Sequence, residues 1–198
     1  MINKWNFQTP SEEELHKRDQ LVAELGFSPV ICLLLVQRGI TSIEEAKKFF
    51  KPSLNDLHDP FLMPDMDKAV RRLNKALGNK EKILIYGDYD VDGTTAVSLV
   101  FKYLRPYSST LDFYIPDRYD EGYGISYKGI DYAAENGVSL VISLDCGIKA
   151  IEKIEYAKEK GIDFIICDHH MPDATLPDAV AVLDAKLSLI HISEPTRP

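Results

Sequence analysis

The sequence predicts an α/β protein, with a twisted parallel sheet that carries helices on both faces and is preceded by a small helical segment. From about residue 82 onward, short apolar runs alternate with helical segments, which is typical of βαβ units. Before that point, capping residues and glycine or proline stops delimit short helices. Acidic residues directly follow three of the apolar runs. We therefore divide the chain into a helical segment (1–78), an α/β domain (79–186) and a tail (187–198).

The first third of the chain is predicted to form short helices, over about residues 11–26, 28–39 and 41–52. Ser11 with Glu14 fits a capping box, and Thr41 with Glu44 repeats the pattern. A turn-rich connector follows, and then a helix near residues 67–77 that Gly78 ends.

The remaining chain is predicted to alternate strands with helices. The expected strands are 83–86, 111–115, 139–144, 163–167 and a weaker 179–183. The expected helices between them are 94–104, 127–136 and 149–160. Because helical crossovers join successive parallel strands, this order predicts a parallel sheet.

The composition is that of an ordinary globular protein, with 45% hydrophobic and 27% charged residues. No apolar run approaches the roughly 20 residues of a membrane span, and the N-terminus lacks a secretory signal, so we expect a cytoplasmic protein with no membrane partner. Three widely spaced cysteines without a CxxC pair indicate neither a disulfide framework nor a zinc ribbon. The net charge of −8 disfavours a pure nucleic-acid-binding module, but carboxylates that bind divalent cations also lower the formal charge.

Acidic segments follow three predicted strands, at the sheet edge where open parallel sheets bind ligands. These segments are Asp88-Tyr89-Asp90-Val91-Asp92-Gly93, Asp145-Cys146-Gly147 and Asp168-His169-His170. So many carboxylates would repel one another in a cleft, which favours a site for divalent metal. Oxygen ligands with imidazoles suit Mn²⁺ or Mg²⁺, and two such ions could clamp a phosphodiester. The pattern predicts phosphoester hydrolysis.

Each segment alone also has a simpler explanation. The DxDxDG pattern resembles a calcium loop, although the missing downstream Glu and the preceding strand argue against calcium. A strand-end residue such as Asp145 often caps the next helix. Cys146 and Cys167 could suggest zinc, but fit better as small buried residues. The adjacent histidines after Asp168 indicate a functional site more specifically, because such a pair at a strand end is rarely a simple surface feature.

Together, and in this order, the three segments resemble the first three motifs of the DHH phosphoesterase superfamily. Residues 31–66 and 116–124 resemble its RecJ branch of single-stranded-DNA-specific exonucleases, and the similarity spans roughly residues 21–186. The resemblance implies a metal pair held by Asp90, Asp92, Asp145 and His169, with Asp88 as a further ligand or an outer neighbour.

The same resemblance implies roles for other residues. His170 would contact the scissile phosphate or the developing charge, and Asp168 would orient the histidines. The family's substrate loop is matched by Arg118, Gly122, Tyr123 and Gly124, although an ordinary glycine-rich turn also fits that stretch. Candidates for base stacking are Tyr89, Tyr119 and Tyr123.

The resemblance implies a metal-dependent 5′-to-3′ exonuclease that acts on single-stranded DNA in repair and recombination, with Mn²⁺ or Mg²⁺ as cofactor. A single-strand-binding protein and a helicase are further candidate partners. Two alternatives stay open: a hydrolase of short oligoribonucleotides, cyclic dinucleotides or pyrophosphate, and a non-catalytic scaffold in DNA replication. The helical front segment disfavours the first, and the presence of the acidic ligands disfavours the second.

The chain departs from the superfamily pattern near its end. The fourth motif supplies another metal-binding Asp and precedes a second domain, and neither is found before Pro198. Asp184 lies too close to the histidine pair to replace it. The last dozen residues do not continue the alternation and are interpreted as a foreign tail. We therefore expect a truncated domain whose catalytic centre is incomplete.

Overall fold

The computed structural model describes residues 9–187. The chain forms two compact units that divide between His58 and Asp59, and each is described by itself. The tail that we interpret as foreign lies, from residue 188, outside the described residues. Among the described helices, none has the length and apolar character needed to cross a membrane.

The first unit is a small helical cluster. Its elements are α1 (Glu12–Leu25), α2 (Pro29–Gln37), α3 (Ile43–Phe50) and the 3₁₀ turn η1 (Leu54–Asp56). The capping box of Ser11 and Glu14 is confirmed. The box that begins α3 is formed by Ser42 and Glu45, one residue later than predicted. Apolar residues from all three helices and from the α2–α3 turn form the buried core of this unit: Leu21, Cys32, Leu35, Val36, Ile40 and Ala46.

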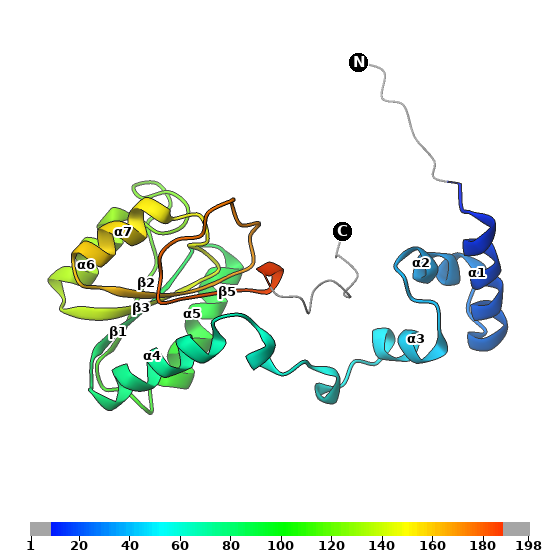
Figure 1. The fold of residues 1–198 in the computed structure, drawn as a ribbon, viewed down its shortest axis with the longest axis horizontal. Coiled ribbons are helices and arrows are strands. Elements are labelled where there is room, and N and C mark those ends of the chain that lie inside the picture. The colour runs from blue at the N-terminus through cyan, green and yellow to red at the C-terminus, as the bar shows by residue number, and fades with distance from the viewer. Residues whose placement is uncertain (1–8, 188–198) are drawn as a thin grey trace, which may run out of the picture. The chain divides into compact units, whose positions relative to one another are not determined.

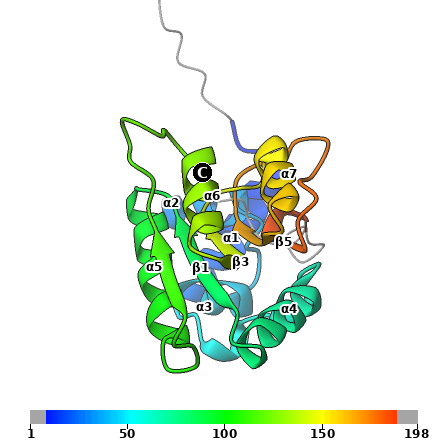
Figure 2. The ribbon, with the colours of Figure 1, turned by 90° about the vertical axis from the view of Figure 1, so that its left-hand side faces the viewer.

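The second unit contains a five-stranded parallel sheet (Figures 1 and 2). Its strands are β1 (Lys82–Gly87), β2 (Leu111–Tyr114), β3 (Val138–Leu144), β4 (Asp163–Asp168) and β5 (Ala181–Asp184). Their order is β2-β1-β3-β4-β5, and each neighbouring pair is parallel. Its helical elements are η2 (Pro60–Leu62), α4 (Met66–Gly78), α5 (Val91–Leu104), α6 (Tyr127–Glu135), α7 (Ile151–Glu159) and η3 (Ala185–Leu187). The predicted α/β fold class is confirmed.

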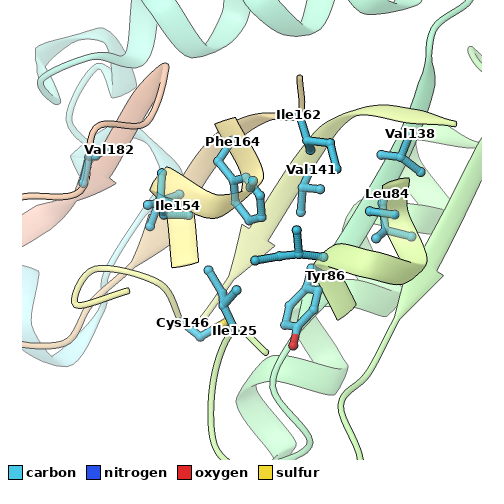
Figure 3. Packing of buried hydrophobic residues seen from close by; sticks show 14 of the residues in the cluster. Leu84, Tyr86, Ile125, Val138, Val141, Cys146, Ile154, Ile162, Phe164 and Val182 are labelled. Atoms are coloured by element: carbon cyan, nitrogen blue, oxygen red, sulfur yellow. The ribbon is translucent and has the colours of Figure 1, made fainter. Parts of the chain in front are cut away.

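Helices cover both faces of this sheet, because its strands are apolar on both sides. Helices α4 and α5 pack on one face, where Ile142 of β3 is buried. On the other face, Val141 of β3 and Phe164 of β4 pack against α6 and α7 (Figure 3). Burial on both faces fixes the register of each strand, since a slip by one residue would exchange the two faces.

Helix α4 packs with the sheet, although the sequence predicts that residues 1–78 form one helical segment. Ala69 and Ala76 lie on the apolar side of α4 and are buried in the sheet's core. The division between the compact units therefore falls about twenty residues earlier in the chain, within the connector.

Arg72 of α4 links this helix to the edge of the sheet where the strands begin. Its Nε donates to Asp163 Oδ2 at 2.6 Å, and its Nη2 donates to Glu81 Oε2 at 2.7 Å and to the Ser139 carbonyl at 3.3 Å. The Arg72 side chain is 10% exposed. Replacing Arg72 with Leu is expected to lower the free energy of unfolding by about 2–3 kcal/mol, because Glu81 would lose its positive partner.

The neighbouring arginine provides the control for this prediction. Arg71 is 69% exposed and, among residues 9–187, pairs only with Asp67 on the helix surface, so Arg71→Leu should change stability by less than about 0.5 kcal/mol. Urea unfolding followed by circular dichroism measures both variants. Equal effects of the two substitutions would show that the Arg72 network does not stabilise the sheet.

Candidate metal centre

The three acidic segments leave the sheet at one edge. In the observed order, β2 lies on one side of β1, whereas β3, β4 and β5 follow on the other side, so the strand order reverses between β1 and β3. The carboxyl ends of strands at such a point form a binding crevice. Asp88 follows β1, Asp145 follows β3 and Asp168 ends β4. The fold therefore places the candidate residues where ligands bind in this class of sheet.

Asp145, His169 and His170 form the centre of the site. Ligand atoms of these three side chains all lie within 4.8 Å of one another, and Asp145 Oδ1 is 2.9 Å from His169 Nε2. Asp145 has a φ of 61°, a strained value for a residue other than glycine. Its backbone N–H still donates to the Cys167 carbonyl at 2.8 Å, which continues the pairing of β3 with β4. The chain thus turns sharply at Asp145 while that residue stays anchored to the sheet.

Asp168 holds the histidine segment in place. Its Oδ1 accepts from the backbone N–H groups of His169 and His170 and from His170 Nδ1, at 2.7, 3.1 and 2.7 Å. Its Oδ2 accepts from the Ile148 N–H at 2.9 Å. Burial alone would raise the pKa of Asp168, but these hydrogen bonds lower it below the usual value. The orienting role of Asp168 stays a prediction.

The tautomer of His170 follows from this arrangement. The Asp168 carboxylate can only accept, so His170 Nδ1 carries a proton, and in a neutral ring Nε2 is then the acceptor. The Tyr123 hydroxyl lies 3.2 Å from His170 Nε2 and can donate to it when the ring is neutral. The His170 ring is therefore held between the buried Asp168 carboxylate, at Nδ1, and the Tyr123 hydroxyl, at Nε2.

The segment after β1 supplies carboxylates with different surroundings. Asp88 is fully buried; its Oδ1 accepts from the Gly124 N–H at 3.4 Å, and its Oδ2 has no hydrogen-bond partner in the described part of the chain. Asp90 Oδ1 accepts from the Gly93 N–H at 2.9 Å and caps α5. Helix α5 consequently begins at Val91, three residues before its predicted start, and Asp92 lies in its first turn.

The electrostatics of the site fit a divalent cation. Burial raises the pKa of Asp145, and the nearby Asp90 carboxylate raises it further, while His169 and His170 partly offset both effects. Burial also raises the pKa of Tyr123, and so do the four carboxylates of Asp88, Asp145, Asp90 and Asp168. These acidic groups therefore act on one region, where a cation would relieve their repulsion and could give the unpaired Asp88 oxygen a partner.

The predicted metal ligands are not equally close to one another. Asp145 and His169 are together, and His170, predicted to contact phosphate, has a ligand atom in the same group. Within residues 9–187, Asp88, Asp90 and Asp92 are not part of this group of converging ligand atoms. Their roles as metal ligands stay predictions.

The predicted substrate loop lies beside the metal centre. The Arg118 guanidinium is 5.3 Å from the centre of the Tyr89 ring, and the Tyr123 ring meets Tyr89 edge to face at 6.1 Å. Gly122 and Gly124 have φ values of 77° and 81°, which glycine adopts without strain. Tyr119, a predicted stacking residue, is 93% exposed.

Sequence reasoning missed one residue of this loop. Glu121 accepts hydrogen bonds from the Tyr114 and Ser126 hydroxyls and from the Asp117 N–H. Its position before Gly122 carried no signal, because a loop glutamate is usually a solvated surface group.

Several curated relatives of this chain share one description. "Single-stranded-DNA-specific exonuclease RecJ" of Bacillus subtilis (strain 168) is 40% identical over 183 residues, which cover 92% of this chain and 23% of the relative. The RecJ of Escherichia coli (strain K12) is 33% identical, over 88% of this chain and 29% of the relative. The chain thus spans about a quarter of the length of these relatives.

Solved structures and family profiles agree with the fold. RecJ from Thermus thermophilus in complex with Mn²⁺ matches with a TM-score of 0.68 and 25% identity, over 92% of this chain and 25% of that one. A second structure, exonuclease RecJ bound to manganese, matches with a TM-score of 0.61 and 28% identity, over 67% of this chain and 34% of that one. The profile described as "DHH family, N-terminal domain" matches residues 82–190, more than half of the chain. The chain therefore belongs to the DHH family.

Proposed function

We propose that this chain is the N-terminal part of a 5′-to-3′ exonuclease that degrades single-stranded DNA with Mn²⁺ or Mg²⁺ as cofactor. The observation that carries the proposal is the convergence of Asp145, His169 and His170 at the reversal point of the sheet. The relatives named as single-stranded-DNA-specific exonucleases support the substrate, and the manganese named in the two RecJ structures supports the metal.

The metal would be held by Asp90, Asp92, Asp145 and His169, with Asp88 beside them. The carboxylates and the imidazole match the oxygen and nitrogen ligands of Mn²⁺. Bound divalent ions would supply Lewis acidity toward the phosphodiester and an activated water.

The other residues of the site would bind and orient the substrate. His170 would contact the scissile phosphate through Nε2 or stabilise the charge that develops there, and Asp168 would orient the ring through Nδ1. Arg118 would pair with a backbone phosphate, because its guanidinium is exposed beside the site. The half-exposed Tyr123 ring and the neighbouring Tyr89 ring would present aromatic surface to an unpaired base.

The cellular setting belongs to the same proposal. A nuclease restricted to single strands needs a helicase or a similar activity to expose its substrate, and it meets a single-strand-binding protein on the exposed strand. Repair and recombination generate such strands, and chromosomal DNA places the reaction in the cytoplasm of a bacterium like those that carry the relatives.

The proposal is tested with the full-length protein, because the chain spans only about a quarter of its relatives. Single- and double-stranded DNA, labelled at either end, are digested with Mn²⁺ and again after chelation with EDTA. We expect mononucleotides to be released from the 5′ end of the single strand, with no release after chelation. Equal digestion of the duplex would overturn the selectivity, and release from the 3′ end would overturn the direction.

A further inference from the structure

The loop between β2 and α6, residues 115–126, brings two exposed side chains to the metal centre. Arg118 reaches the Tyr89 ring, and Tyr123 reaches His170 through its hydroxyl. A twelve-residue segment without helix or strand would ordinarily sample many conformations. Contacts with the rest of the domain must therefore hold this loop if Arg118 and Tyr123 are to keep these positions.

The carboxylate of Glu121 ties this loop together. Its Oε1 accepts from the Asp117 N–H at 2.8 Å and from the Tyr114 hydroxyl at 3.0 Å. Its Oε2 accepts from the same hydroxyl at 2.9 Å and from the Ser126 hydroxyl. One side chain thus joins the end of β2, the beginning of the loop and the residue that caps α6.

The groups that Glu121 joins to the loop are themselves well anchored. The Tyr114 ring stacks on the Tyr86 ring, with 5.4 Å between centroids and an interplanar angle of 18°. Ser126 is 6% exposed and accepts from the Gly129 N–H at 2.9 Å as the N-cap of α6. The buried Tyr86 hydroxyl accepts from the Ser126 N–H at 3.1 Å and donates to the Gly124 carbonyl at 3.0 Å. The carboxylate therefore joins a surface loop to the packed core.

These contacts favour an ionised carboxylate. All three partners donate to Glu121, so an amide at this position, with one oxygen in place of two, would keep fewer of these hydrogen bonds. Burial opposes ionisation, but hydrogen bonds from Asp117, Ser126 and Tyr114 lower the pKa of Glu121 overall. Burial and the adjacent Glu121 charge raise the pKa of Tyr114 to about 12, so its hydroxyl remains a donor.

We propose that Glu121 is a positioning residue: its carboxylate fixes the 115–126 loop so that the Tyr123 hydroxyl stays on His170 and Arg118 stays on Tyr89. That these two side chains meet a DNA substrate rests on the proposed function. That Glu121 fixes the loop rests on the geometry alone. Displacement of a substrate-contacting group by about 1 Å can cost about 100-fold in rate, so this anchor controls catalysis without touching DNA.

The first test needs no activity. Trypsin cleavage after Arg118 is followed by mass spectrometry in the purified chain, and cleavage after Lys102, within α5, reports general unfolding. Glu121→Gln is expected to speed cleavage after Arg118 by about tenfold, because a loosened loop opens to the protease more often. Cleavage after Lys102 should stay unchanged. Unchanged cleavage after Arg118 would overturn the proposal.

The matched control is Asp120→Asn. It removes one charge from the same loop, but the Asp120 side chain is 74% exposed and only approaches Lys128, at 3.9 Å. Cleavage after Arg118 should stay at the wild-type rate, and an increase equal to that of Glu121→Gln would assign the effect to lost charge and overturn the proposal. If Glu121→Gln fails to fold, Tyr114→Phe keeps the stacked ring and removes one donor. It should speed cleavage after Arg118 several-fold, and no change would again contradict the proposal.

The second test uses the full-length protein. Glu121→Gln is expected to lower kcat by about 100-fold while the Mn²⁺ affinity and the thermal midpoint stay at wild-type values. A loss of kcat that follows a loss of Mn²⁺ affinity or of thermal stability would show a structural role and overturn the positioning role. If the wild-type protein does not cleave DNA, the proposed function fails, and the proteolysis still decides whether Glu121 fixes the loop.

Discussion

Replacing Asp145 with Asn is expected to lower DNA cleavage by the full-length protein by about 1,000-fold or more, equivalent to about 4 kcal/mol of transition-state stabilisation. Asp145 Oδ1 lies 2.9 Å from His169 Nε2, in the group of converging ligand atoms. An amide keeps the size of the side chain but removes the charge that attracts a cation. Weaker Mn²⁺ binding, measured by calorimetry, should accompany the loss of rate.

The control for this prediction is Asp178→Asn. The Asp178 side chain is 73% exposed and pairs with Lys158 on the surface, so its loss should change neither the rate nor the metal affinity. The Asp145 substitution should also leave the fold intact, because the backbone bond of Asp145 to Cys167 does not involve the side chain. Full activity in Asp145→Asn would place the catalytic metal elsewhere.

The fold could be predicted largely from local signals. Apolar runs between turn residues located the five strands, because strands buried on both faces must be apolar throughout. The strand order could not be predicted, since it depends on pairing between distant segments. The cap of α3 was misplaced because Thr41 with Glu44 and Ser42 with Glu45 show the same local pattern. The observed start buries Ala46 in the core of the helical unit.

The site was predictable to the extent that it depends on strand ends. The position of Asp145 and His169 follows from the rule that carboxyl ends of parallel strands share one edge. The start of α5 was missed because Asp90 was interpreted as part of an acidic loop, whereas its side chain also caps the helix. Glu121 could not be found from the sequence, because its importance lies in donors of β2, the loop and α6 that only the folded chain brings together.

Gly93→Ala is expected to lower the free energy of unfolding by about 3 kcal/mol or more and to remove DNA cleavage. Gly93 lies in the first turn of α5, against the backbone that leaves β1. A Cβ there would stand 2.4 Å from the Asp88 carbonyl oxygen and 2.6 Å from the Asp88 nitrogen. Backbone atoms cannot move aside as a side-chain end can, so the turn itself must shift. Asp88 and Asp90 would shift with that turn, so stability and catalysis should fall together.

Gly78→Ala separates this effect from the general consequence of adding a methyl group to a helix. Gly78 also lies in a helix, at the end of α4, and a Cβ there would meet nothing within 4 Å. Because alanine favours the helix more than glycine does, Gly78→Ala should stabilise the protein by about 0.5–1 kcal/mol and leave activity unchanged. Urea unfolding and the cleavage assay measure both variants. A stable, active Gly93→Ala protein would mean that the turn between β1 and α5 tolerates a side chain. It would also mean that the close packing of this turn does not set the positions of Asp88 and Asp90, the predicted metal ligands.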